Sequence, residues 1–155
     1  MFKNLILLFF AFTLTVHAQN SSMQKGDPIE FEVIMQDAQS NNKRESYQLI
    51  SSSSDLLKVV GMANMGRSKS YKLPQVDFSK YSMVFLNLGE QSTGGISVEV
   101  KKVVDNGSDW IVYYEVKRPG ADEMATTVMT TPFALIRIPR PTSKVGFEEV
   151  GSTQR

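Results

Sequence analysis

"SMVFLNLGEQSTGGISVEV", residues 82–100, decides the fold class. Its first half is nearly continuous in apolar residues, as expected of a β-strand that is covered on both faces. From Ile96 onward, apolar and polar residues alternate strictly, which is typical of a strand with one buried face. The small and polar residues between the two halves predict a turn, with Gly94 and Gly95 supplying positive φ angles. Two core strands joined by a glycine turn therefore form the centre of the predicted domain.

The alternating strand is expected to continue into a hairpin. "GISVEVKKVV" and "WIVYYEVKR" flank "DNGSD", in which Asn106-Gly107 is a strong hairpin signal because both residues tolerate positive φ angles. The residues expected to face the core alternate along both strands: Ile96, Val98, Val100, Trp110, Val112, Tyr114 and Val116.

The rest of the chain adds further short strands and one helix. "PIEFEVIMQ" predicts a strand with its apolar side chains on one face, namely Ile29, Phe31, Val33 and Met35, and "YQLI" predicts a short second strand. "SSSSDLLKVVGMANMG" predicts a helix that is capped by Ser53 or Ser54 and ends near Gly66. "EMATTVMTTPFALIRIP" predicts one or two final strands, broken at Pro132. The expected fold is mainly β: an antiparallel β-sandwich or barrel-like domain with one short α-helix.

The N-terminal residues predict export. Lys3 precedes an apolar run that ends in Val16-His17-Ala18, which is typical of a signal peptide over residues 1–18. The expected protein is periplasmic or secreted, with no membrane span and, because it has no cysteine, no lipid anchor. The expected organisation continues with a disordered leader (19–27), an N-terminal strand and loop (28–45), a main domain (46–140) and a polar tail (141–155).

Composition excludes several kinds of chemistry. The chain has no cysteine, and its single histidine, His17, lies in the expected signal peptide. Imidazole and thiolate catalysis and zinc sites are therefore excluded from the exported protein, and we expect no metal or other cofactor. Loss of Lys3 lowers Lys plus Arg from 17 to 16, which equals the 16 Asp plus Glu. This balance does not favour a nucleic-acid partner.

Short motifs that could carry chemistry have simpler explanations. "STGG" lacks the lysine and the following helix of a phosphate-binding loop, so it is interpreted as a turn. "SMQK", residues 22–25, matches Ser-x-x-Lys but lies in the expected leader. The acidic pairs Asp122-Glu123 and Glu148-Glu149 are interpreted as solvated charges, and Thr126, Thr127, Thr130 and Thr131 as an exposed strand face.

Several segments together resemble the C-terminal domain of the PrcB family, named for an accessory subunit of a secreted bacterial serine-protease complex. They are "VDFSKYSMVFLNLGEQSTGGISVEVKKVV", "WIVYYEVKRPG" and "TTPFALIRIPR". With the preceding "LISSSSDLLKV", the resemblance covers about residues 46–140. One departure is Ile96, which stands where the family usually has an aromatic residue after Thr-Gly-Gly.

This resemblance implies a non-catalytic partner that binds or stabilises an exported protease. The contact residues would lie in loops at strand ends or along a sheet edge. The candidates are Ser92, Thr93, Gly94, Gly95, Pro119, Gly120, Thr130, Thr131 and Pro132. Two alternatives remain open: a protease inhibitor similar to chagasin, and an enzyme or binding module that uses carboxylates on envelope glycans.

Overall fold

The computed structural model describes residues 26–120 and 127–151, which form two four-stranded sheets and one helix. One sheet has the order β1-β5-β6-β8, and the other has the order β2-β7-β4-β3. All neighbouring strands are antiparallel except β6 and β8. The elements in chain order are β1 (Asp27–Ile29), β2 (Glu32–Asp37), β3 (Ser46–Ile50), α1 (Ser53–Asn64), β4 (Tyr81–Asn87), β5 (Ser97–Asp105), β6 (Asp109–Lys117), β7 (Phe133–Pro139) and β8 (Lys144–Glu149).

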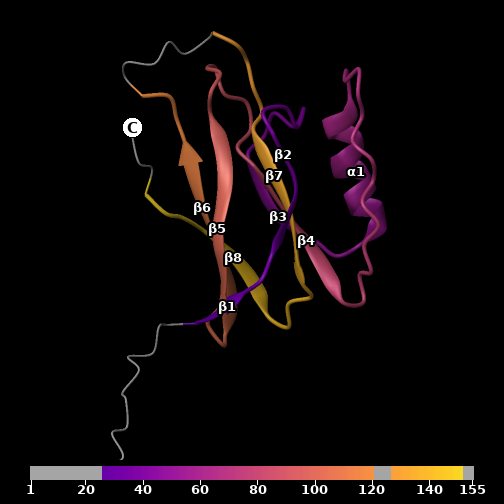
Figure 1. The fold of residues 1–155 in the computed structure, drawn as a ribbon, viewed down its shortest axis with the longest axis vertical. Helices are drawn as coiled ribbons and strands as arrows, with labels where there is room; N and C mark the ends of the chain where they lie inside the picture. The colour runs from indigo at the N-terminus through magenta and orange to yellow at the C-terminus, as the bar shows by residue number, and fades with distance from the viewer. Residues whose placement is uncertain (1–25, 121–126, 152–155) are drawn as a thin grey trace, which may run out of the picture.

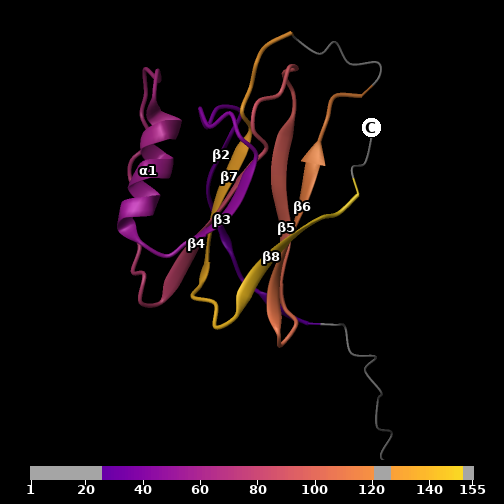
Figure 2. The same cartoon turned by 180° about the vertical axis from the view of Figure 1, so that it is seen from behind.

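The two sheets pack face to face, and α1 covers the outer face of the second sheet, so the domain has three layers (Figures 1 and 2). The sheets are not closed into a barrel. The sandwich prediction is therefore confirmed, and the helix forms an additional layer on it.

Strand β4 is buried on both faces, as its continuous apolar sequence predicted. Val84 and Leu86 point between the sheets, whereas Met83 and Phe85 point toward α1. Strand β7 alternates in the same way, with Ile136 between the sheets and Leu135 under the helix. The centre of the second sheet thus joins two hydrophobic cores, and burial of apolar surface on both sides stabilises it.

The predicted core residues of the hairpin, from Ile96 to Val116, are all buried. The reversal itself lies one residue later than expected. The amide of Asn106 donates to the carbonyl of Asp109 at 3.0 Å, which leaves Gly107 and Ser108 as the two central turn residues. Gly107 has a φ of 84°, so the glycine occupies the first central position, as in a type II′ turn.

Helix α1 follows its predicted pattern. Its apolar stripe, Leu56, Val59, Val60 and Ala63, is buried against the second sheet. The cap is Ser52, one residue before the predicted pair, and its hydroxyl accepts a hydrogen bond from the amide of Asp55 at 3.2 Å. The helix ends at Asn64, and Gly66 follows with a φ of 73°.

The expected N-terminal strand is divided between the two sheets. Strand β1 pairs with β5, the chain crosses over at Glu30 and Phe31, and β2 pairs with β7. A bulge between Val33 and Met35 then changes the alternation, so Val33 is exposed while Met35 is buried. The prediction of one continuous apolar face was wrong because one strand cannot serve two sheets without a break in its side-chain period.

The segment predicted as a polar tail contains strand β8, which pairs in parallel with β6. Its Val145 and Phe147 pack against the core between the sheets, while Glu148 and Glu149 are exposed. An edge strand with one solvated face needs few apolar residues, so strand β8 could not be predicted from its polar composition.

Candidate functional site

The candidate contact residues gather at one end of the sandwich, where the turn after β4, the segment after β6 and the approach to β7 meet (Figure 1). Gln91 and Thr130 exchange two backbone hydrogen bonds, of 2.8 and 2.9 Å. The amide of Leu88 donates to the carbonyl of Pro132 at 3.0 Å. The glycine turn and the segment before β7 are therefore held together as one rigid end.

Two glycines of the turn, Gly89 and Gly95, are needed for its backbone, whereas Gly94 does not have the positive φ angle that was predicted for it. Gly89 has a φ of 70°, and a Cβ there would lie 2.7 Å from the amide nitrogen of Glu45 and 2.9 Å from the carbonyl oxygen of Lys43. Gly95 has a φ of 81°, and a Cβ there would lie 2.8 Å from Cγ of Pro119. Only glycine fits both the conformation and the close approach. The turn also brings together two predicted site residues, Gly95 and Pro119.

The two threonines before Pro132 are structural, contrary to the prediction of an exposed strand face. Thr130 and Thr131 are each 6% exposed. The hydroxyl of Thr130 donates to the carbonyl of Thr93 at 3.3 Å, and the hydroxyl of Thr131 accepts from the amides of Ser40 and Asn41 at 2.9 and 3.0 Å. Their side chains satisfy buried backbone groups, as burial of polar atoms requires.

The remaining predictions for this end divide by exposure. Thr127 is exposed as expected, whereas Thr126 and the pair Asp122-Glu123 lie outside the described residues. Of the nine candidate contact residues, Gly94, Thr130, Thr131 and Pro132 are buried. The other five candidates are exposed or half-buried and contribute to the surface of this end: Ser92, Thr93, Gly95, Pro119 and Gly120.

A loop at the same end, residues 38–45, links the strands to the helix. Asn41 adopts a φ of 61°, and its side-chain amide donates to the carbonyls of Met62 and Met65 at 2.9 and 3.0 Å, which satisfies carbonyl groups at the end of α1. The buried side-chain amide of Asn87 donates to the carbonyls of Asn42 and Arg44 at 3.0 and 2.6 Å, and its Oδ1 accepts from the hydroxyl of Ser40. This loop therefore fixes the position of α1 relative to β4.

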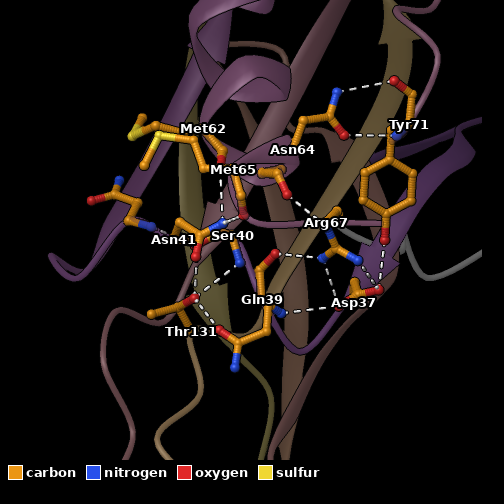
Figure 3. A network of polar contacts seen from close by, with 12 residues as sticks. Asp37, Gln39, Ser40, Asn41, Met62, Asn64, Met65, Arg67, Tyr71 and Thr131 are labelled. Atoms are coloured by element: carbon orange, nitrogen blue, oxygen red, sulfur yellow. Dashed lines mark hydrogen bonds and ion pairs between the residues drawn. The ribbon is translucent and has the colours of Figure 1, made fainter. Parts of the chain in front are cut away.

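An ion pair that the sequence analysis missed reinforces this link. Figure 3 shows Arg67, just after α1, directed toward Asp37 at the end of β2. The guanidinium donates to both carboxylate oxygens of Asp37 at 2.9 and 3.2 Å, to the carbonyl of Gln39 at 2.7 Å and to the carbonyl of Ala63 at 2.6 Å. The hydroxyl of Tyr71 donates to Asp37 at 2.6 Å. A bidentate pair of this kind is geometrically specific, so it clamps the helix end to the sheet.

The protonation states of this cluster agree with a structural role. Partial burial disfavours ionisation of Asp37, but hydrogen bonds from Arg67, Tyr71 and the Gln39 amide outweigh it and hold the pKa of the carboxyl below its ordinary value. Burial and the neighbouring carboxylate raise the pKa of Tyr71 to about 12. At neutral pH, Asp37 is an ionised acceptor and Tyr71 a protonated donor. Asp37 lies 30 residues before Arg67 and 34 residues before Tyr71, so no local sequence pattern indicated this contact.

The described surface includes two hollows that bear on the site. One, of about 240 Å³, opens beside the glycine turn and includes Glu45, Tyr47, Arg118 and Glu149 in its lining. The other, of about 330 Å³, includes Glu32, Tyr81 and Arg137. In that hollow, Arg137 lies 4.9 Å from the ring centroid of Tyr81 and forms an ion pair with Glu32, so its charge is already neutralised.

In residues 26–120 and 127–151, no three His, Cys, Asp or Glu side chains are grouped as metal ligands. In the same part of the chain, no helix has the length and apolar character that crossing a membrane requires. Glu148 and Glu149 are neighbours on strand β8, so their side chains point to opposite faces of the sheet.

The architecture defines a β-sandwich that carries a helix on one face and rigid loops at one end. Residues 82–139, from β4 to the end of β7, match the family model described as PrcB C-terminal. The chain therefore contains a PrcB C-terminal domain, which confirms the family that its sequence resembles. Strand β3 and helix α1 precede the matched range and pack directly on it. No curated protein and no solved structure matches the chain.

Proposed function

We propose that this chain is a secreted, non-catalytic accessory subunit that binds or stabilises an exported protease. The observation that carries the proposal is the PrcB C-terminal domain at residues 82–139, because that family is named for a subunit of a protease complex. The five surface residues of the rigid end, Ser92, Thr93, Gly95, Pro119 and Gly120, are the proposed contact surface.

The construction of this end supports a binding role. Loops held by a rigid scaffold lose little conformational entropy when they bind a partner. Here the turn after β4 is fixed by Thr130, by Pro132 and by the close approach of Gly89 to the loop at residues 43–45. Met65 and Met129 have exposed apolar side chains. Both residues lie at the same end of the sandwich, because the side-chain amides of Asn41 and Gln39 donate to their backbone carbonyls. Methionine side chains adapt readily to a partner surface.

The proposal is tested by affinity capture from the native envelope with tagged residues 19–155, followed by mass spectrometry. We expect an exported protease to be recovered. A Thr93→Arg variant should weaken binding of the recovered protease by at least about tenfold, since a long charged side chain would stand in the contact surface. Thr142→Arg is the control for the added arginine, because Thr142 is exposed and lies in the connection between β7 and β8 at the opposite end.

Two results would contradict the proposal. Recovery of an envelope glycan or another receptor without any protease would remove the protease as partner. Equal calorimetric affinity of the protease for the wild type, Thr93→Arg and Thr142→Arg would remove this end as its contact surface. The activity of the recovered protease, measured with and without the subunit, separates a stabilising subunit from an inhibitor.

A further inference from the structure

Four strands form the edges of the two sheets, and three of them carry features that hinder pairing with another strand. Strand β1 has three residues and contains Pro28. Strand β2 is interrupted by its bulge and ends at Asp37, which is bound to Arg67. Strand β8 carries Lys144 and two exposed glutamates. Strand β3, "SYQLI", has no proline or charge and pairs with β4 in unbroken register.

The hydrogen-bond pattern shows which groups of β3 point away from the sheet. The amide of Leu88 bonds toward β7, through the carbonyl of Pro132. Because bonding alternates along an antiparallel strand, Leu86 and Val84 also bond toward β7, whereas Asn87, Phe85 and Met83 bond toward β3. Their partners in register are Ser46, Gln48 and Ile50.

The N–H and C=O groups of Tyr47 and Leu49 therefore face outward. Among the residues that the structure describes, no backbone hydrogen bond joins Tyr47 or Leu49 to a segment on this side. Strand addition uses outward donors and acceptors of this kind, and the main-chain hydrogen bonds that it forms supply affinity.

The side chains along this edge form an apolar strip between the sheets. Tyr47 packs on Tyr114 and Phe147, with ring centroids 5.1 and 5.7 Å apart. Leu49 is 37% exposed and lies opposite Val84, on the same face of the sheet. An added strand would place every second side chain over Leu49 and the half-buried Phe147 of β8.

The 240 Å³ hollow lies at the end of this strip nearest the glycine turn. Leu88 and Val116 supply apolar lining, while Glu45 and Glu149 supply two carboxylates against the single guanidinium of Arg118. The hydroxyl of Tyr47 donates to Glu45 at 2.6 Å, which holds that carboxylate in place. The excess of negative charge favours a lysine or arginine side chain in the hollow.

We propose that the β3 edge accepts an extended segment of the partner protein by strand addition. The segment carries apolar residues at alternate positions and a basic residue at the end that reaches the hollow. A second copy of the chain fits less well, because antiparallel pairing of two β3 strands about Gln48 would bring Ser51 of the copy, and no basic residue, opposite Glu45. The identity of the partner as a protease rests on the proposed function, whereas the edge and the pattern of the segment do not.

A displayed library of random peptides of about ten residues, selected against residues 19–155, tests this inference without knowledge of the protease. The enriched peptides should alternate apolar and polar residues and carry Lys or Arg near one end. Amide hydrogen exchange of Tyr47 and Leu49 should slow when they bind. Leu49→Lys, which places a charge on the edge, should weaken binding at least about tenfold. Leu57→Lys is the matched control, since Leu57 is 58% exposed on α1.

Both variants are first checked for an unchanged circular dichroism spectrum. Failure to enrich peptides, equal binding by Leu49→Lys and Leu57→Lys, or slowed exchange only in β8 would each overturn the inference. A concentration-dependent dimer that Leu49→Lys abolishes would assign the edge to a second copy and would also overturn it.

The affinity capture described above keeps the two proposals distinguishable. If Leu49→Lys captures the protease as well as the wild type does, the edge is not its contact and the proposed function stands. If no protease is captured by the wild type, the proposed function fails while the peptide result still decides the edge.

Discussion

Alanine substitution at three glycines with positive φ angles should destabilise the fold to three different degrees. At Gly107, φ is 84° and an added Cβ would meet nothing within 4 Å. At Gly95, φ is 81° and the Cβ would lie 2.8 Å from a ring carbon of Pro119. At Gly89, φ is 70° and the Cβ would lie 2.7 and 2.9 Å from main-chain atoms of Glu45 and Lys43.

The magnitudes follow from these surroundings. A positive φ angle costs alanine about 1 kcal/mol relative to glycine, so Gly107→Ala should lower the free energy of unfolding by about that amount. Gly95→Ala should cost about 1 to 2 kcal/mol, because the proline ring can yield slightly. Gly89→Ala must displace a backbone, with loss of the hydrogen bonds from Glu90 to Lys43 and from Asn87 to Arg44. At about 1 kcal/mol each, these bring the total to about 3 kcal/mol.

Urea unfolding of residues 19–155 measures this series. The chain has one tryptophan, Trp110, which is buried between the sheets, so its fluorescence reports the global transition. The expected order of destabilisation is Gly107→Ala, then Gly95→Ala, then Gly89→Ala. Equal losses within about 0.5 kcal/mol would refute the reasoning, because strain at φ alone would then account for all three.

The remaining predictions concern the helix and its attachment to the sheet. Leu56→Ala should lower the free energy of unfolding by about 3 kcal/mol, because Leu56 is buried between α1 and the sheet. Leu57→Ala should change the free energy of unfolding by less than about 0.5 kcal/mol, because Leu57 is exposed. Similar values for the two variants in urea unfolding would contradict the position of α1. Asp37→Asn should cost about 2 kcal/mol at neutral pH, because it leaves Arg67 without its charged partner. The pKa of Asp37 is lowered from 3.8 in the folded state. The stability that the wild type has over Asp37→Asn is therefore present above about pH 4 and is lost as the pH falls through the folded pKa. A difference in unfolding free energy between the two proteins that is the same at about pH 7 and pH 2.5 would contradict the clamp.

The central strands could be predicted because local sequence determined their environment. Strand β4 is continuously apolar because both of its faces are covered, and β5 and β6 alternate because one face is solvated. The stripe of α1 likewise identified its buried face. In each case the period of the side chains carries the information.

The features that were not predicted depend on contacts between distant residues. The crossover at Phe31 depends on which sheet each half of the segment joins, and no local pattern marks that choice. Strand β8 is stabilised by pairing with β6 despite its polar sequence. Thr130 and Thr131 are of a residue type that is common on exposed strand faces, yet the loop at residues 38–45 and the glycine turn bury them. The sequence therefore placed the candidate contact residues at strand ends, but it did not show which of them are exposed, and their role in binding stays a prediction.

Hydrogen exchange on the complex with the recovered protease tests the central claim most directly. We expect slower exchange in residues 88–96 and 118–120, at the end that carries Thr93 and Pro119. Exchange should be unchanged in residues 106–108 and 140–143, at the opposite end of the sandwich (Figure 1). Slower exchange confined to that opposite end, or no change anywhere on mixing the two proteins, would contradict the account.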